Sequence, residues 1–209
     1  SAAWFRYYRN LNFRSDVFDA NLAIEFTPYN FALGGDDRSV LSPYAFIGIG
    51  LFAFNPQGFY NGQWIDLKPL RTEGQGLVDG RAPYDLVQMN LPMGLGIKWT
   101  YNNTWSVGLE VNYRMTFTDY IDDVSTDYVT DESSFAANMD PSTASIALDM
   151  ARRSDELDPA GVNAEVTAPG QQRGDPKDND AYYTVTVRVS YYLYPEAGGG
   201  GRRYGCPVW

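Results

Sequence analysis

Residues 87–117 read VQMNLPMGLGIKWTYNNTWSVGLEVNYRMTF, and this stretch decides the fold. From Val87 to Tyr101, and again from Trp105 to Phe117, every odd-numbered position holds an apolar or aromatic residue. None of the even-numbered positions in these two runs holds a large apolar residue. A period of two predicts two β-strands, each with one face in an apolar medium. The intervening asparagines, 102 and 103, tolerate positive φ and predict a tight hairpin turn.

The length of these strands indicates a membrane protein. Ordinary strands have about 5–6 residues, and a strand tilted across a bilayer needs about 9–11. Both runs exceed the second value, and no charge falls on their apolar face. Trp99, Tyr101 and Trp105 flank the turn, where amphipathic rings are expected at a membrane interface. We therefore expect apolar side chains to face lipid. Alternation alone leaves open a soluble barrel or sandwich with the same face turned inward.

Three further segments have strand character, so five strands are expected in all. They are residues 13–27, 43–54 and 182–194. The first and last alternate clearly, whereas both faces of 43–54 are apolar and leave its orientation open. Long loops are expected at 55–85 and 119–180, and a shorter turn at 28–42. Within the second loop, Asp140 followed by proline predicts a helix N-cap and a short helix over 141–157.

This pattern predicts an all-β fold, a transmembrane antiparallel up-and-down β-barrel. Long loops of such barrels lie outside the cell and short turns in the periplasm, so the first visible strand enters from outside. Because bacterial barrels of one chain have even strand numbers, we expect an odd number of N-terminal strands to be missing and eight in the full protein. We expect residues 1–197 to form this N-terminally incomplete barrel. Residues 198–209, which begin with four glycines, are expected to form a flexible periplasmic tail.

Composition narrows the classes of function. The chain has no His and one Cys, so many common catalytic schemes and metal sites lack their usual residue. Residues 119–180 contain 15 acidic and 4 basic residues, a net charge of −11, whereas the rest of the chain is close to neutral at +1. This sign opposes nucleic-acid binding. We expect no enzyme activity, cofactor, nucleic acid or small-molecule substrate.

Charged residues on the polar strand faces are expected to form a lumenal network that fills a narrow barrel. They are Asp19, Glu25, Lys98, Glu110, Arg114 and Arg188. An eight-stranded barrel has room for side chains rather than an aqueous pore, so a channel is the weaker alternative. A calcium site at Asp119, Asp122, Asp123 and Asp127 is another alternative, although their spacing follows no EF-hand loop. At the barrel rim, Asp119 and Asp122 could also pair with Arg173.

Several segments of the chain resemble PorG-like outer-membrane barrel proteins of the type IX secretion system. The most specific is FTDYIDDVS at 117–125; the others are SPYAFIGIG at 42–50, LKPLRTEGQG at 67–76, LPMGLG at 91–96, QRG at 172–174 and Cys206-Pro207. That family begins with further strands and a Tyr-rich segment, which this chain lacks. The resemblance covers nearly the whole chain.

The resemblance implies a non-enzymatic role in protein export, with a periplasmic ring of lipoprotein and partner subunits anchored to the outer membrane. Bilayer lipid and this ring are the expected partners, and the C-terminus is expected in the periplasm. The tail residues expected to bind the ring are Arg202, Arg203, Tyr204, Cys206, Pro207 and Trp209. Cys206 is either an inert thiol or a contact to a partner. The alternative is a small OmpA-like surface barrel or adhesin that binds an external target through its acidic loop.

Overall fold

The computed structural model describes residues 7–33, 39–102, 104–158, 160–161 and 164–193. Their contacts divide the chain into two compact units, which we describe separately. Unit 1 comprises residues 1–23, 48–92 and 114–182. Unit 2 comprises residues 24–47, 93–113 and 183–209.

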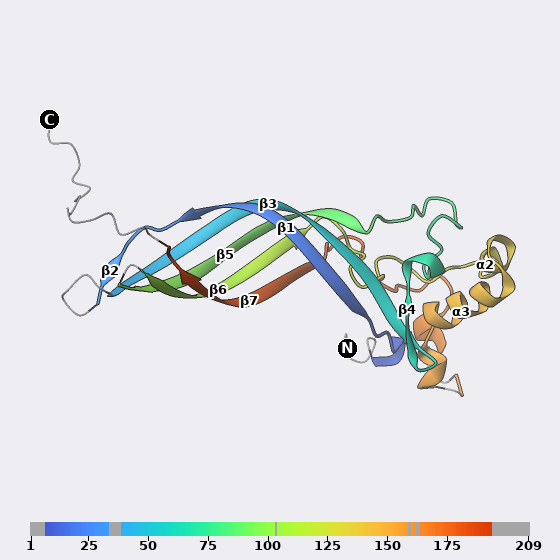
Figure 1. Ribbon diagram of the computed structural model, residues 1–209. Helices are drawn as coiled ribbons and strands as arrows, with labels where there is room; N and C mark the ends of the chain where they lie inside the picture. The colour runs from blue at the N-terminus through green and yellow to red at the C-terminus, as the bar shows by residue number, and fades with distance from the viewer. Residues whose placement is uncertain (1–6, 34–38, 103, 159, 162–163, 194–209) are drawn as a thin grey trace. The chain divides into compact units, whose positions relative to one another are not determined.

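The fold is a mostly antiparallel, barrel-like β-sheet with few helices (Figure 1). Five long strands follow the order β1-β3-β5-β6-β7, and two short strands, β2 and β4, pair with β3. The strands are β1 (Arg14–Phe26), β2 (Phe31–Ala32), β3 (Ser39–Tyr60), β4 (Gln63–Asp66), β5 (Val87–Tyr101), β6 (Trp105–Thr116) and β7 (Ala181–Tyr191). The helices are α2 (Ser133–Asn138) and α3 (Pro141–Ala151), with 3-10 turns η1 (Lys68–Leu70), η2 (Ser154–Glu156) and η3 (Ala164–Thr167). Within the described residues, no helix is both long and apolar enough to span a membrane.

All five predicted strands are present, and the central hairpin lies where the alternation placed it. Asn102, at the turn of that hairpin, has φ of 50°. The strand predicted over 43–54 was too short at both ends, because β3 runs from Ser39 to Tyr60. There Asn61 and Gly62 take positive φ and reverse the chain into β4, which pairs antiparallel with the end of β3. Asn-Gly is the dipeptide that a two-residue hairpin turn favours, so the expected loop at 55–85 begins with a hairpin.

Two central strands of the sheet, β5 and β6, are apolar on their exposed side and polar on their more buried side. Along β6, Val107, Leu109 and Val111 are 41–49% exposed. Glu110 and Asn112, which alternate with them, are only 8% and 5% exposed. β5 has the same pattern, with its odd-numbered positions more exposed than its even-numbered ones. A water-soluble sheet buries its apolar face instead. In this sheet the polar face is therefore the one turned inward.

In unit 1, the loops form a packed layer that we call the loop module (residues 67–86 and 117–180). Helix α3 begins as predicted, because the Asp140 carboxylate accepts hydrogen bonds from the backbone N–H groups of Ser142 and Thr143, each at 3.1 Å. It ends at Ala151, six residues before the predicted end at 157. The chain turns there into η2, where Ser154 is buried. Helix α2, next to α3 (Figure 1), was not predicted.

An apolar core holds the loop module against the β3–β4 hairpin. Its buried members are Leu67, Leu70, Val129, Phe135, Ala144, Ala147 and Met150. Gly58 of β3 lies so close to Leu67 and Met150 that a Cβ atom there would clash with Met150. The hydroxyl of Tyr60 also donates to the Asp149 carboxylate of α3 at 2.8 Å. The loop module is therefore an ordered part of the fold.

In unit 2, glycines of β5 make room for large rings from β3. A Cβ atom at Gly96 would overlap the ring of Tyr44, and one at Gly94 would overlap Phe46. The small residues of β5 thus leave space for aromatic side chains on the buried face.

Candidate functional site

The six charged residues predicted to line the polar face form three ion pairs. One pair lies in unit 1 and two lie in unit 2, and each joins residues from two different strands. The pairs are Asp19–Arg114 at 3.2 Å, Glu25–Lys98 at 2.9 Å and Glu110–Arg188 at 3.1 Å. Each carboxylate is neutralised by a cation, which lowers the cost of placing charges on the buried side of a sheet.

Asp19 is the hub of the network in unit 1. Besides Arg114, it accepts hydrogen bonds from the Tyr182 hydroxyl at 3.2 Å and from Asn90 Nδ2 at 2.5 Å. Asn21 on the same strand donates to its other oxygen at 2.6 Å. The side chains of Asp19 and Arg114 are each 12% exposed. The Asp19 carboxylate therefore accepts from four donors, which lie on strands β1, β5, β6 and β7.

Glu110 has the corresponding role in unit 2. It accepts from the Tyr44 hydroxyl at 2.9 Å and from Arg188 Nη2 at 3.1 Å. Lys98 Nζ lies 4.9 Å from the centroid of the Tyr44 ring, a cation–π distance. The glycine at 96 leaves the space that this tyrosine occupies. These groups satisfy one another, as expected of a packed polar interior.

The most deeply buried polar cluster lies in the loop module, around an ion pair between Glu73 and Arg173. Arg173 Nη1 lies 2.9 Å from Glu73 Oε1, and the two residues are 2% and 0% exposed. Glu73 also accepts from the backbone N–H of Ser125, and from the backbone N–H and hydroxyl of Thr126, at 2.8–2.9 Å. Arg173 Nη1 donates a second hydrogen bond to the Asp123 carbonyl at 2.6 Å. One ion pair therefore joins three loops.

Asp123 completes this cluster, which we call the Glu73 cluster. Its carboxylate accepts from the Thr72 hydroxyl at 2.5 Å and from the Tyr84 hydroxyl at 2.7 Å. Burial raises the pKa of Asp123, although Arg173 and these two donors oppose the shift. Burial and the neighbouring Asp123 carboxylate also raise the pKa of Tyr84, so this hydroxyl stays protonated and donates. The Tyr84 ring stacks on Tyr120, with centroids 4.6 Å apart.

The Glu73 cluster draws on three segments that carry the family resemblance. Thr72 and Glu73 come from LKPLRTEGQG, Asp123 and Ser125 come from FTDYIDDVS, and Arg173 comes from QRG. The expected pairing of Arg173 with Asp119 or Asp122 was wrong, because Arg173 pairs with Glu73. No role was predicted for Glu73 from the sequence. Glu73 is a single acidic residue between Thr72 and Gly74, and no local pattern indicates its partner, which lies 100 positions away.

Two of the four acidic residues considered for calcium, Asp122 and Asp123, accept hydrogen bonds within the loop module. Within the described ranges, no group of three or more His, Cys, Asp or Glu residues is placed to hold a metal ion. Asp122 Oδ1 accepts from the backbone N–H of Val124 at 3.0 Å. Burial, with nearby carboxylates, raises the pKa of Asp119 to about 7 and that of Asp122 to about 6. Desolvation is the main cause of both shifts, and the nearby carboxylates add to it.

The tail residues predicted to bind a partner lie outside the described residues. They are Arg202, Arg203, Tyr204, Cys206, Pro207 and Trp209.

The fold and the polar network together define a β-barrel-like protein with a polar inner face and an apolar outer face. A family model described as a domain of unknown function, DUF6089, matches residues 1–140, and the chain belongs to this family. The match includes Glu73 and Asp123 and ends before Arg173. Neither a curated protein nor a solved structure matches the chain.

Proposed function

We propose that this chain spans the outer membrane and is a non-enzymatic component of the type IX protein secretion machinery. In this role it anchors a periplasmic ring complex, a lipoprotein with its partner subunits, to the membrane. The observation that carries the membrane placement is the inverted burial of the sheet. Large apolar side chains on all five long strands are exposed, while the charged side chains of the opposite face form ion pairs, and Asp19, Glu110 and Arg114 among them are largely buried.

Strand length supports the transmembrane placement. The five long strands have between 11 and 22 residues. A tilted strand needs about 9–11 residues to cross a bilayer. In unit 2, Trp105 packs edge-on against Tyr191 with centroids 4.8 Å apart, and Trp99 lies 6.2 Å from Tyr101. In unit 1, Trp64 packs against Phe59 at 5.3 Å. Rings of this kind form the aromatic girdles of membrane barrels.

Loop length supports the expected sidedness. We infer that the long loops, 55–85 and 119–180, are extracellular and that the shorter turns, 28–42 and 102–103, are periplasmic, because long loops of outer-membrane barrels lie outside. The C-terminus is then expected in the periplasm.

Open sheet edges support an eight-stranded barrel. Among the described strands, β1 and β7 each have a neighbour on one side only. An exposed edge within a bilayer leaves backbone groups without hydrogen bonds, so barrels close completely. Three further strands between β7 and β1 would close the sheet at eight, the smallest common barrel size.

The secretion role rests on the sequence resemblance, and a deletion tests it. Removal of residues 198–209 from the protein in its native membrane should release the ring from the outer membrane. The barrel itself should still migrate as a heat-modifiable folded species on gels. Replacement of Cys206 by Ser is the matched variant, and crosslinking at Cys206 would identify the subunit that the tail reaches. Undiminished co-purification of the ring without the tail would contradict the assigned anchoring role.

The second candidate is an OmpA-like surface barrel that binds an external target through the acidic loop. The ordered loop module, held by the Glu73–Arg173 pair, favours this alternative because a pre-organised surface loses less entropy on binding. A strain that lacks the protein distinguishes the two functions. Loss of cargo export supports the secretion role, whereas normal export with altered surface binding supports the adhesin.

A further inference from the structure

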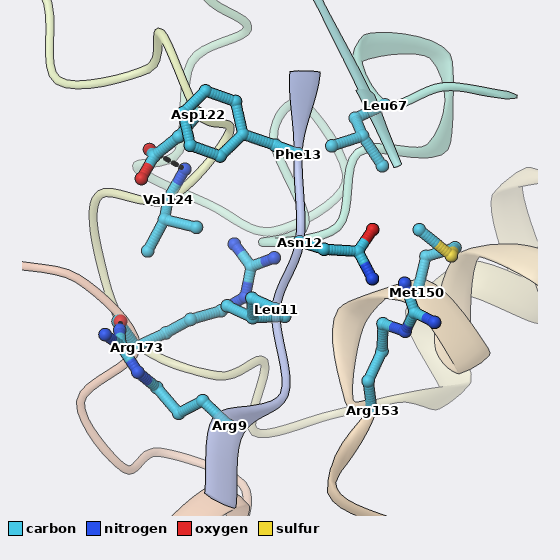
Figure 2. A pocket seen from close by; sticks show the side chains of 10 residues that line it. All are labelled: Arg9, Leu11, Asn12, Phe13, Leu67, Asp122, Val124, Met150, Arg153 and Arg173. Atoms are coloured by element: carbon cyan, nitrogen blue, oxygen red, sulfur yellow. Dashed lines mark hydrogen bonds between the residues drawn. The ribbon is translucent and has the colours of Figure 1, made fainter. Parts of the chain in front are cut away.

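A small pocket with an arginine-rich wall lies in unit 1, between the loop module and the residues that precede β1 (Figure 2). Its volume is about 190 Å³. Three arginines line it: Arg9, Arg153 and Arg173. The other lining residues are Asp122, Asn12 and five apolar residues, Leu11, Phe13, Leu67, Val124 and Met150. The charge of this wall opposes that of the acidic loop as a whole.

Arg153 and Arg173 each have a buried N–H group for which the described residues provide no acceptor. Arg153 is 7% exposed and binds Glu156 through Nε and Nη2, at 2.9 and 3.0 Å. Its Nη1 is buried and has no hydrogen-bond partner. Arg173 is 2% exposed and uses Nη1 in the Glu73 cluster, while its buried Nε has no partner. Buried cationic donors without acceptors are costly, so they point to an acceptor outside the described residues.

The existing pairs hold both guanidinium groups in place. Both carboxylate oxygens of Glu156 accept hydrogen bonds from Arg153. Asn10 donates to the Arg153 carbonyl at 3.2 Å and to Glu156 Oε2 at 2.8 Å. On the other side, Arg9 Nη1 donates to the Arg173 carbonyl. The donors are therefore fixed before a ligand arrives, which reduces the entropy lost on binding.

The size and lining of the pocket restrict the ligand. The volume equals about six waters at about 30 Å³ each, well below the range of about 300–1,000 Å³ for drug-sized ligands. The two donors equal in number the two oxygens of one carboxylate, whereas a phosphate dianion presents more oxygens and a second charge. Asp122 on the wall further disfavours a dianion. The five apolar residues fit a small hydrocarbon group.

We propose that this pocket binds one carboxylate attached to a small apolar group, with Arg153 Nη1 and Arg173 Nε as its donors. The ligand is either a free short-chain acid or the C-terminal carboxylate of a peptide that ends in an apolar residue. Both sources share this chemistry. The site is separate from the paired carboxylates of the strands and does not depend on the secretion role.

The test is calorimetric titration of the whole purified protein in detergent. The probes are 4-methylpentanoate, its neutral amide, inorganic phosphate, and a short leucine-terminated peptide with a free or an amidated C-terminus. We expect the acid to bind and the amide and phosphate to bind about ten- to hundredfold more weakly, as for loss of a charged hydrogen bond. If the peptide with a free C-terminus binds, the natural ligand is a peptide C-terminus. If the short acid binds and this peptide does not, the natural ligand is a free short-chain acid. Equal binding of acid and amide, or tighter binding of phosphate, would overturn the proposal.

Two variants and a control locate the site. Arg153→Met should weaken binding of the acid about ten- to hundredfold, since it removes one donor. The carboxylate of Glu156, whose side chain is 51% exposed, would then be solvated by water. Arg152→Met is the matched control: Arg152 pairs with Glu132 at the surface and does not line the pocket. Should Arg153→Met fail to fold, Leu11→Phe fills the same pocket from another wall and should also abolish binding. Unchanged affinity in a folded Arg153→Met or Leu11→Phe protein would refute the assignment.

Discussion

Replacement of Glu73 by Gln tests whether the buried ion pair holds the loop module together. The substitution keeps the size of the side chain and removes its charge. Arg173, which is 2% exposed, then remains buried beside a neutral amide. The backbone N–H groups of Ser125 and Thr126, which now donate to two carboxylate oxygens, must share one amide oxygen.

The expected cost follows from this geometry. Breaking a buried ion pair by removing one partner costs about 3–5 kcal/mol, and the retained amide oxygen places this variant near the lower end. About 3 kcal/mol corresponds to a roughly hundredfold larger opening equilibrium, since about 1.4 kcal/mol is a factor of ten. The loss should be local to the loop module, because the polar pairs of the strands are independent of Glu73.

Hydrogen exchange of two backbone amides measures this opening. The Tyr128 N–H donates to the Gln171 carbonyl and the Arg173 N–H to the Thr126 carbonyl, both at 2.8 Å, so neither bonds to Glu73 itself. Glu132→Gln is the control, because it breaks the exposed pair with Arg152 and should cost less than about 1 kcal/mol. Equal exchange in the two variants would show that the buried pair does not hold the loops.

Three further predictions concern the strands and the loop acids. Leu109→Arg, on the exposed face, should reduce stability in lipid vesicles by about 2–4 kcal/mol in a denaturant titration, and no loss would contradict lipid contact there. Gly96→Ala should cost about 1–3 kcal/mol by overpacking, whereas Gly108→Ala, whose Cβ would meet its nearest neighbour at 3.5 Å, should be nearly neutral in the same assay. The pKa values of Asp119 and Asp122 are raised from 3.8 to about 7 and 6, so the folded loops keep protons that the unfolded chain releases. Loop stability should therefore be greatest near pH 4 and fall as pH rises through 7, with faster exchange after correction for intrinsic rates; a rise in stability would refute these shifts.

The strands were predictable because their signal is local. Alternation along 87–117 specifies a strand and its two faces without reference to the rest of the chain. The same pattern fits lipid outside or a core inside, so the inward face could only be inferred from strand length and ring placement. The three-dimensional arrangement decides it, with Leu109 exposed and Glu110 buried.

The loop module was less predictable because its contacts are distant in sequence. Glu73 and Arg173 lie 100 positions apart, and no period or short motif relates them. The hairpin at Asn61 and Gly62 is different, since this dipeptide is a known hairpin signal. It was overlooked because the sequence around it was assigned to a single long loop.

The inverted burial of the sheet also affects how such a chain can reach its native state. In water, spontaneous collapse draws Leu109 and its neighbours together and leaves Glu110 outside, which is the reverse of the native arrangement. The solvent, and not the chain alone, thus selects the side that becomes the interior. With the proposed membrane placement, the chain needs a carrier that shields its apolar side chains until it reaches lipid, since unpaired strand edges and exposed apolar surface promote aggregation.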